Sequence, residues 1–412
     1  MKVGIIGAGA SGMAVTAFLG EKNISNLEIC LFDKNNSFGK KVLLTGGGRC
    51  NLTNSIKNRK EFLSKYVRGQ DLVDKVTSKF SVKKTMAFFE KNGLSLKEED
   101  NFRIFPKSEK SIDVIRCFEK IIRKNKNISL CFNEVVEDVN FDGKYKIKTS
   151  KNNYTFDYLV IATGGNTYVK SGSSGDGYEI AKKLGHNITK LVPSLASFQV
   201  QESFCANVSG ISFPKANLVF GNKKLDGGLI FTHFGISGPV VFALSAHLAY
   251  EEISSKKPYK IKFIPDIKLS FESLDSKLQE LIKKNPTKQI KNLLQEILPK
   301  KFIDEVLYLY LNFLDSNGSR LSKEDRKKIC HLLTSGIELN LTGRQSGEEF
   351  VTAGGVDLKE INYETLGSNK VDGLYFCGEV LNVDAVTGGF NLQFCWSSGY
   401  VIASSISEKL IY

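Results

Sequence analysis

The sequence lacks the long apolar runs that membrane proteins carry. In its 412 residues no stretch of about 18 or more uncharged apolar residues occurs, and a membrane-spanning helix needs roughly that length. The first residues, MKVGIIG, read as a strand and show none of the charged, apolar and small-residue zones of a signal peptide. We therefore expect no membrane span, no export and a cytoplasmic location.

Metal-binding and redox motifs are also missing. The chain has eight cysteines and four histidines, but no cysteine forms a CxxC pair or a zinc-like cluster with histidine. No CxxxxC pair occurs, which argues against a disulfide reductase. We expect no metal site and free thiols, as is usual in a reducing cytoplasm.

Positive charge is in excess, and the net charge of the chain is +13. Such a charge suits nucleic acid or a membrane surface, yet the lysines are interleaved with acids, as between Ser322 and Cys330. Solvated surface is therefore the favoured interpretation and nucleic acid the minority one. The other composition values, 42% hydrophobic and 25% charged, are those of a globular protein. The length suggests two or three domains, and nothing predicts the oligomeric state.

The N-terminal stretch KVGIIGAGASGMAVTAFLG has the pattern of a buried strand, a tight turn and a helix. Gly7, Gly9 and Gly12 complete the motif GxGxxG. Gly7 lets the strand reverse, Gly9 lets the backbone approach a pyrophosphate, and Gly12 lets the helix pack on the sheet. The helix N-terminus then offers N–H groups and a positive dipole end to the phosphates.

A second apolar strand, EICLFD, ends in Asp33. This acid lies 21 residues beyond Gly12, close to the roughly twenty expected for a carboxylate that binds ribose. An acid here disfavours the 2′-phosphate of NADP. The alternative is that Asp33 is only a turn residue at the end of a strand.

The stretch LLTGGGRCNLTN, Leu43 to Asn54, carries three consecutive glycines. An isolated glycine run is usually a surface turn, but a cofactor longer than NAD needs a second close approach. We interpret the glycines as space for FAD as it extends from the pyrophosphate toward the flavin. Arg49 would bring positive charge to phosphate or reduced flavin. Cys50 is favoured as a packed small residue over a redox nucleophile.

The middle of the chain predicts further elements. Helices are expected at 82–92 and 109–124, the second capped by Ser108, and the strand DYLVIATGG returns to the cofactor. Residues 191–264 alternate like an antiparallel β subdomain. The stretch 270–333 is helical, with Asn285 as a cap and Pro286 opening a helix.

His233, in the glycine-rich bend FTHFGISGP, is either a structural residue or one that faces substrate.

The C-terminal region predicts a return to the cofactor. GLYFCGE reads as a strand ending in Gly378 and Glu379, whose carboxylate would accept hydrogen bonds from cofactor hydroxyls. TGGFNLQFCW is a glycine turn that feeds a helix, and a helix N-terminus at the pyrimidine end of a flavin stabilises negative charge on the reduced ring. The cofactor domain would then be discontinuous.

The sequence resembles the BaiN-like flavoproteins, a bacterial family of NAD(P)/FAD-dependent oxidoreductases. The resemblance runs nearly end to end over GAGASG, KKVLLTGGGRCNLTN, FRIFPKS, ATGG, GSSGDGYEIAKKLGH, FTHFGISGP, VTAGGVDLKEIN and YFCGEVLNVDAVTGGFNLQ. It implies an α/β, discontinuous, glutathione-reductase-like Rossmann domain that binds FAD, with inserted β-barrel and helical subdomains. Members have been linked to aminoacetone oxidation or to reduction of bile-acid derivatives. Where members carry glutamate after the second strand, this chain has Asp33, a shorter acid that still reaches a ribose.

The motifs and the resemblance together give the predicted domains and site. The domains are 1–190 and 338–412 for the two FAD-binding segments, 191–268 for the β subdomain and 269–337 for the helical one. The candidate catalytic residue is His233. The predicted cofactor-binding residues are Gly7, Gly9, Ala10, Ser11, Gly12, Asp33, Lys34, Lys40, Thr45, Gly46, Gly47, Arg49, Cys50, Asn51, Val135, Ala162, Thr163, Gly164, Gly378, Glu379, Gly389, Phe390, Asn391 and Leu392.

Three functions follow as hypotheses. The first is an FAD-dependent oxidoreductase that transfers hydride through flavin N5 between a small organic substrate, of amine or enone/alcohol type, and NAD(P)H or oxygen. No second dinucleotide motif occurs, so NAD(P)H would bind only transiently. The second is an FAD protein that acts on RNA. The third is a flavin-binding protein without catalytic activity.

Overall fold

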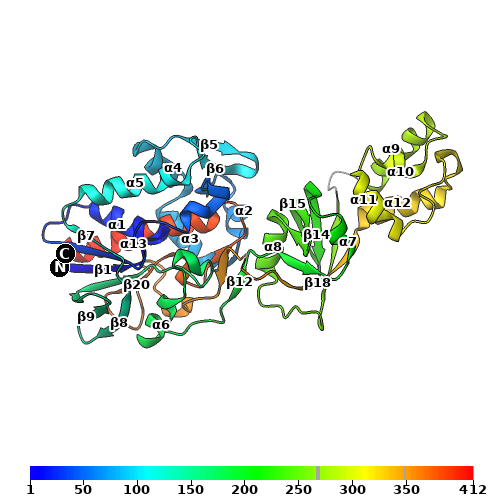
Figure 1. Cartoon of the computed structure of the whole chain (residues 1–412). Helices are drawn as coiled ribbons and strands as arrows, with labels where there is room; N and C mark the ends of the chain where they lie inside the picture. The colour runs from blue at the N-terminus through cyan, green and yellow to red at the C-terminus, as the bar shows by residue number, and fades with distance from the viewer. Residues whose placement is uncertain (266–269, 348, 412) are drawn as a thin grey trace. The chain divides into compact units, whose positions relative to one another are not determined.

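The apolar strand that begins the chain lies in the middle of a parallel five-stranded sheet (Figure 1). Its neighbours come from distant parts of the sequence, in the order β20, β11, β1, β2, β7. Parallel strands covered on both faces need nearly continuous apolar sequence, which explains runs such as VGII and YLVI. The strands are β1 (Lys2–Ile6), β2 (Glu28–Asp33), β7 (Ile128–Phe132), β11 (Tyr158–Ile161) and β20 (Leu374–Phe376).

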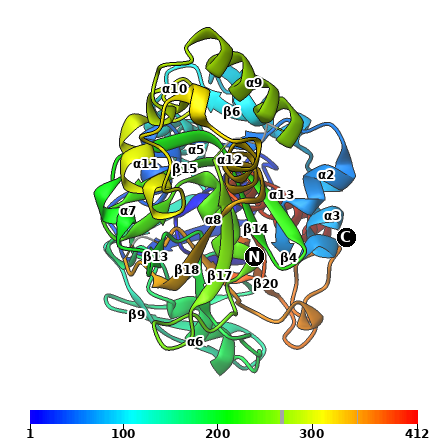
Figure 2. The same ribbon diagram turned by 90° about the vertical axis from the view of Figure 1, so that its right-hand side faces the viewer.

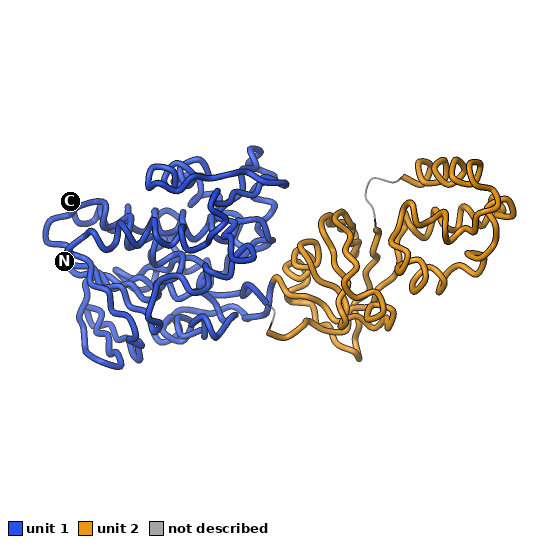
Figure 3. The backbone as a smooth tube through the Cα atoms, turned by 45° about the horizontal axis from the view of Figure 1, so that its top comes forward, with its two compact units in different colours: residues 1–194, 349–412 blue, residues 195–348 orange. Residues whose placement is uncertain are grey.

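The computed structural model describes residues 1–265, 270–347 and 349–411. The chain divides into unit 1, residues 1–194 and 349–412, and unit 2, residues 195–348 (Figure 3). Each unit has its own core of buried apolar side chains. The predicted boundary between the β and helical subdomains, at residues 268 and 269, lies outside the described residues, and the four-part division of the chain stays a prediction.

Helices cover one face of the five-stranded sheet and a small antiparallel sheet covers the other. The helix α1 (Ala10–Gly20) packs against α5 (Ser111–Lys124) and against the last helix, α13 (Phe390–Ile411). A Cβ atom on Gly399 would lie 2.6 Å from the Cβ of Ala14, so only glycine allows α13 to approach α1 this closely. On the other face, a Cβ on Gly4 would lie 2.9 Å from the ring of Phe156 in β10 (Asn153–Phe156).

The remaining elements of unit 1 form short sheets and helices around this centre. Two of the sheets are three-stranded and two are two-stranded, all antiparallel. The sheets are β8 (Val136–Phe141) and β9 (Tyr145–Thr149) with β10; β3 (Thr53–Asn54), β6 (Arg103–Pro106) and β5 (Leu96–Glu99); β4 (Tyr66–Arg68) and β21 (Asp384–Ala385); β12 (Val192–Ser194) and β19 (Val351–Ala353). The helices are α2 (Arg59–Ser64), α3 (Gln70–Lys79), α4 (Val82–Lys91) and α6 (Asp176–Lys183).

Unit 2 consists of a closed antiparallel barrel with helices inserted between its strands (Figure 2). The barrel order is β13, β16, β15, β14, β17, β18. Its strands are β13 (Phe198–Val200), β14 (Ser212–Phe220), β15 (Lys223–Thr232), β16 (Gly235–Ser237), β17 (Tyr259–Ile264) and β18 (Ile337–Arg344). Its helices are α7 (Phe204–Asn207), α8 (Pro239–His247), α9 (Phe271–Lys284), α10 (Ile290–Leu294), α11 (Lys300–Glu305) and α12 (Lys323–Ser335).

These observations confirm the predicted fold class. Both ends of the chain build one α/β domain of Rossmann type, and a β-barrel and helices are inserted between its segments. Among the described helices, none has both the length and the apolar character that crossing a bilayer requires.

Two predicted helix starts are wrong. Asn285 does not cap a helix that opens at Pro286; it ends α9, and the next helix begins at Ile290. The intervening backbone bonds to a distant segment instead, since Ser319 N donates to Pro286 O at 2.8 Å and Ile290 N donates to Ser316 O at 3.0 Å.

The helix after FRIFPKS begins at Ser111 rather than Glu109, so Ser108 is not its cap. Glu109 has a φ of 55°, and its N–H closes a turn on the carbonyl of Pro106 at 3.0 Å. A residue in the left-handed region does not belong to an α-helix. The chain therefore turns once before the helix starts.

Candidate functional site

The turn between β1 and α1 leaves open space at the middle glycine of GAGASG. A Cβ on Gly7 would lie 2.5 Å from the carbonyl oxygen of Ala162, and one on Gly12 would lie 1.7 Å from that of Gly7. Those two glycines therefore serve close packing. At Gly9 no heavy atom of the described residues lies within 4 Å of a Cβ position. A ligand can thus reach the main chain at Gly9, in front of the N–H groups that begin α1.

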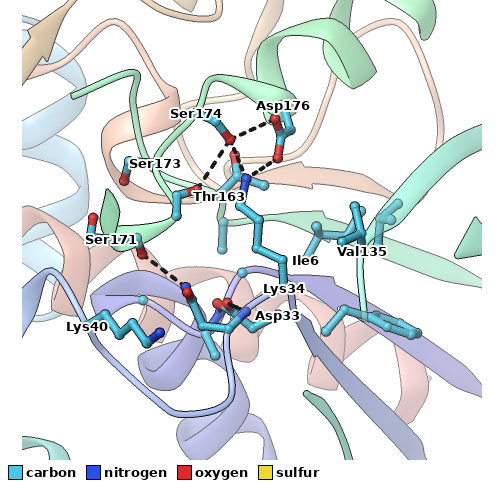
Figure 4. A pocket seen from close by; sticks show the side chains of 18 of the residues that line it. Ile6, Asp33, Lys34, Lys40, Val135, Thr163, Ser171, Ser173, Ser174 and Asp176 are labelled. Atoms are coloured by element: carbon cyan, nitrogen blue, oxygen red, sulfur yellow. Dashed lines mark hydrogen bonds and ion pairs between the residues drawn. The ribbon is translucent and has the colours of Figure 1, made fainter. Parts of the chain in front are cut away.

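A hollow that opens to solvent lies in front of this turn. Its lining comes from the loops that follow β1, β2, β7 and β11, at the carboxyl ends of the parallel strands. Ligands of open α/β sheets bind at this edge. Figure 4 shows side chains from these separate segments around one space. Eight predicted cofactor-binding residues line it: Gly7, Gly9, Asp33, Lys34, Lys40, Val135, Ala162 and Thr163.

Asp33 organises the floor of the hollow. Its Oδ2 accepts a hydrogen bond from Ala8 N at 2.7 Å, and its Oδ1 accepts one from Asn35 N at 2.8 Å. The half-buried carboxylate thus fixes both the glycine turn and its own loop. A carboxylate has about four lone-pair sites, so each oxygen retains capacity for a ribose hydroxyl.

The loop 171–176 is fastened to the residues that follow Asp33. The ammonium group of Lys34 pairs with Asp176 at 2.5 Å and also hydrogen-bonds Ser174, as the dashed lines of Figure 4 mark. Asn35 Nδ2 donates to the carbonyl of Ser171 at 3.0 Å. Partial burial by itself raises the pKa of Asp176, but the hydrogen bonds from Lys34 and Ser174 outweigh it and the pKa is lowered. The loop is therefore held by a charged aspartate at neutral pH.

Glu379 lies beside a lysine that the sequence did not single out. Its carboxylate pairs with Lys41 at 2.9 Å and accepts a hydrogen bond from Thr352 N at 3.0 Å. Lys41 also donates to the Thr167 hydroxyl at 3.0 Å. The residue predicted from the sequence is its neighbour Lys40, and both lysines line the hollow. Two adjacent lysines give no sequence signal for which one meets the carboxylate.

The triple-glycine loop adopts a backbone that other residues resist. Gly46, Gly47 and Gly48 have φ values of 57°, 67° and 83°, all in the left-handed region that favours glycine. No heavy atom of the described residues lies within 4 Å of a Cβ position on Gly47. These glycines are thus needed for the turn itself, and the loop leaves open space on its outer side.

The residues around the glycines differ in their surroundings. The side chain of Thr45 donates to Val42 O at 2.7 Å, and its carbonyl accepts from Cys50 N at 2.9 Å. Cys50 is fully buried, which raises the pKa of its thiol to about 12. Such a thiol is a packing residue and not a nucleophile. The Oδ1 atom of Asn51 is buried and has no hydrogen-bond partner among the described residues.

Arg49 is paired with acids. Its guanidinium lies 3.0 Å from Glu99 and 3.6 Å from Glu109, and it covers the ring of Phe105 at 4.2 Å from the centroid. Its charge is therefore balanced within the protein. The prediction that Arg49 serves phosphate or flavin stays a prediction.

The C-terminal segment reaches the same region as the N-terminal one. Gly378, with a φ of 73°, packs so closely on the first helix that a Cβ would lie 1.9 Å from Ser11 Oγ. A Cβ on Gly389 would lie 2.5 Å from the carbonyl oxygen of Thr53, just after the triple-glycine loop. The predicted residues of both chain ends therefore come together in unit 1.

The first turn of α13 is fixed by side-chain contacts. Asn391 exchanges two hydrogen bonds with the main chain of Ala385, each 3.0 Å long. The hydroxyl of Tyr66 donates to the carbonyl of Phe390 at 2.8 Å. Leu392 is half-buried beside them. The other predicted residues of the glycine loops, Ala10 and Gly164, lie at the start of α1 and directly after Thr163.

His233 is not brought together with these residues within one unit. It lies in unit 2, in the turn between β15 and β16, and its side chain is exposed. Its ring contacts that of Phe234, with the centroids 5.0 Å apart. A role for His233 stays a prediction.

The site fits an elongated dinucleotide. Open space at the backbone of Gly9 and at Gly47 leaves the main chain accessible at two points of unit 1. Two buried oxygens, Thr163 Oγ1 and Asn51 Oδ1, have no hydrogen-bond partner among the described residues. Buried polar atoms left unsatisfied cost about 1–3 kcal/mol each, so a bound group with hydroxyl and N–H functions suits them.

Comparison with known proteins gives matches along the whole chain. The profile of the family described as HI0933-like protein Rossmann domain matches residues 1–405. The chain is 30% identical to the 3-dehydro-bile acid delta(4,6)-reductase of Clostridium scindens, over 99% of both chains. It is 29% identical to the ribosomal RNA dihydrouridine synthase of Haemophilus influenzae, over 98% of both chains. A solved structure, the 3-ketosteroid delta1-dehydrogenase of Sterolibacterium denitrificans, matches 99% of both chains with a TM-score of 0.52 and 11% identity, which shows a shared fold.

Proposed function

Because the chain belongs to the HI0933-like Rossmann family and is an FAD-dependent oxidoreductase, we propose that it reduces a carbon–carbon double bond conjugated with a carbonyl group. The observation that carries this proposal is what two full-length relatives have in common. One is named as a reductase of the delta(4,6) bonds of a 3-dehydro-bile acid and the other as a synthase of dihydrouridine. Both names describe the saturation of a double bond in conjugation with a carbonyl.

The proposed reaction adds a hydride to the carbon β to the carbonyl and a proton to the α carbon, while NAD(P)H is oxidised to NAD(P)⁺. The carbonyl withdraws electrons, so the β carbon is the electrophilic one. When bound, FAD supplies the hydride-transferring atom, N5. A reduction needs an electron donor, and NAD(P)H is the one that we propose, because it donates a hydride to flavins. Oxygen remains the alternative partner, in which case the enzyme would act as an oxidase.

The chain's own residues would hold and orient the cofactor. We assign the main chain at Gly9 and the N-terminus of α1 to the pyrophosphate, because that turn is open and carries a positive helix end. Asp33 is assigned to the adenosine ribose and Glu379 to hydroxyls farther along. The N-terminus of α13 is assigned to the pyrimidine end of the flavin, where helix N–H groups favour negative charge.

The test is reoxidation of reduced enzyme by enones. The FAD-loaded protein is reduced without oxygen, and its visible absorbance is followed after addition of cyclohexenone or of a steroid enone such as progesterone. We expect the flavin absorbance to return with these compounds and not with cyclohexene, which has the double bond without the carbonyl. Reoxidation by oxygen alone, with no response to any conjugated substrate, would contradict the proposal.

His233 is the candidate proton donor to the α carbon, because it lies in an exposed glycine-rich bend. We expect His233→Ala to lower kcat for an identified enone by about tenfold or more, since general acids contribute about 10²–10⁴-fold. The rate of flavin reduction by NAD(P)H should not change, which makes it the internal control. Equal kcat in the variant and the wild type would remove His233 from the mechanism.

A second candidate substrate is uridine in ribosomal RNA. It is favoured by the name of the relative from Haemophilus influenzae and by the net charge of +13. The uracil ring contains the same conjugated arrangement as an enone. This candidate requires binding to ribosomal RNA that weakens steeply with added salt and a gain of two hydrogens in a uridine, measured by mass spectrometry of the digested RNA. If the RNA stays unmodified after incubation with reduced enzyme, uridine is excluded as the substrate and the small-molecule enone is the only candidate of the two.

A further inference from the structure

The first turn of α13 contains a glutamine that is fully buried and fully hydrogen-bonded. Gln393 has 0% exposure. Its Oε1 accepts a hydrogen bond from the hydroxyl of Thr53 at 2.6 Å. Its Nε2 lies 2.7 Å from Ser397 Oγ, 2.9 Å from Thr85 Oγ1 and 3.3 Å from the carbonyl of Phe80. Ser397 belongs to α13 itself, and the other three partners lie in β3, at the end of α3 and in α4, so one amide links the start of the last helix to three other segments.

The contact with Thr53 connects the two glycine loops of the site. Thr53 begins β3, two residues after Asn51, and its carbonyl oxygen lies directly against Gly389. Trp396, one turn further along α13, donates its indole N–H to the carbonyl of Leu52 at 3.0 Å. The strand that follows the triple-glycine loop is therefore bound by side chains of α13.

A buried amide is a poor means of stabilising a core. Leaving even one of its groups unpaired costs about 1–3 kcal/mol. An apolar side chain of similar volume fills the same space and has no polar group that could be left unpaired. The value of a polar network lies in its directional bonds, which fix one arrangement of the groups they join. At Gln393 those groups are the N-terminus of α13 and the strand beside the triple-glycine loop.

We propose that Gln393 is a positioning residue that holds the N-terminus of α13 in the register that sets the reduction potential of the bound flavin. The proposal rests on the placement of the flavin at that helix end, as assigned in the proposed function. A helix N-terminus stabilises negative charge on the reduced ring only over the length of its first turn. Loosening that turn therefore disfavours reduction and lowers the potential.

The test measures the midpoint potential of FAD-loaded variants by reductive titration against redox dyes. Thr53→Val removes the hydroxyl donor with little change of shape, Gln393→Met removes the whole network, and Thr53→Ser restores the donor. We expect Thr53→Val and Gln393→Met to shift the ratio of reduced to oxidised flavin at least tenfold, or about 30 mV for a two-electron couple. Thr53→Ser should stay at the wild-type potential.

Matched controls separate positioning from stability. Thr77→Val removes another buried hydroxyl of unit 1, one that donates to the carbonyl of Val73 within α3 at 2.7 Å, and should lower the melting temperature without shifting the potential. A potential unchanged in Thr53→Val and Gln393→Met, with only a lower melting temperature, would overturn the proposal. If Gln393→Met does not fold, Thr53→Val and Thr85→Val carry the test.

The potential is read without any organic substrate, so its outcome does not depend on the proposed reaction. Shifted potentials in a protein that reduces no enone would refute the reaction and leave the role of Gln393 standing. A wild-type protein that reduces enones while its variants keep the wild-type potential would refute only the role of Gln393.

Discussion

A Gly9→Val substitution is expected to abolish tight FAD binding while the apoprotein stays folded. Gly9 has φ and ψ of −74° and −166°, a conformation that any residue adopts, and no heavy atom of the described residues lies within 4 Å of its Cβ position. The valine side chain would occupy the space assigned to the pyrophosphate. We expect the Kd for FAD to rise at least about 100-fold, or about 2.7 kcal/mol, in a fluorescence titration of the apoprotein.

The contrast with the neighbouring glycine makes this prediction specific. A Cβ at position 12 would lie 1.7 Å from the carbonyl oxygen of Gly7, so Gly12→Ala damages the turn itself. That variant should lose thermal stability and FAD binding together. Wild-type affinity in a folded Gly9→Val protein would show that the pyrophosphate does not lie at this turn.

The second large effect is expected at Asp384, a carboxylate with 0% exposure in β21. Both of its oxygens accept hydrogen bonds from the guanidinium of Arg68 in β4, and the hydroxyl of Ser194 donates to Oδ2 at 2.9 Å. Burial raises the pKa of Asp384 although hydrogen bonds and the charge of Arg68 oppose the rise. We expect Asp384→Ala to destabilise unit 1 by about 3–5 kcal/mol, the usual cost of removing one partner of a buried ion pair.

The unfolding of unit 1 can be followed by the fluorescence of Trp396, the single tryptophan of the chain. It is fully buried in unit 1, stacked on Phe118 at a centroid distance of 5.2 Å. Denaturant titrations of wild type and Asp384→Ala give the two free energies of unfolding. The double variant Arg68→Met with Asp384→Leu should recover most of the loss, since replacing both partners by apolar residues is often neutral. A loss below about 1 kcal/mol in Asp384→Ala would mean that the pair contributes little.

The parts of the fold that local sequence controls could be predicted. The strand, turn and helix of GAGASG follow from glycines a few residues apart, and the parallel sheet follows from apolar runs. The family profile and the full-length relatives confirm the resemblance to BaiN-like flavoproteins. That the two ends of the chain form one domain could also be predicted, because each end carries a glycine turn beside an apolar strand.

Contacts between distant segments could not be predicted. The partners of Arg49 are Glu99 and Glu109, which are separated from it by some fifty residues or more and announced by no motif. The same holds for the pairing of 286–290 with 316–319, which removed the helix expected at Pro286. The sequence indicates that 171–176 is a glycine-rich junction, but its contacts with Lys34 and Asn35, which place it at the hollow, carry no sequence signal. The assignment of individual residues to cofactor and catalysis stays a prediction.

The antiparallel pair of β12 and β19 determines how the insertion is attached. Ser194 pairs with Val351, so the chain leaves unit 1 and re-enters it at adjacent points of one ribbon. An insertion whose two ends are adjacent can be lengthened, shortened or exchanged without a change in the path of the surrounding chain. A lineage can therefore change the inserted unit while the Rossmann-type domain around it keeps its connectivity.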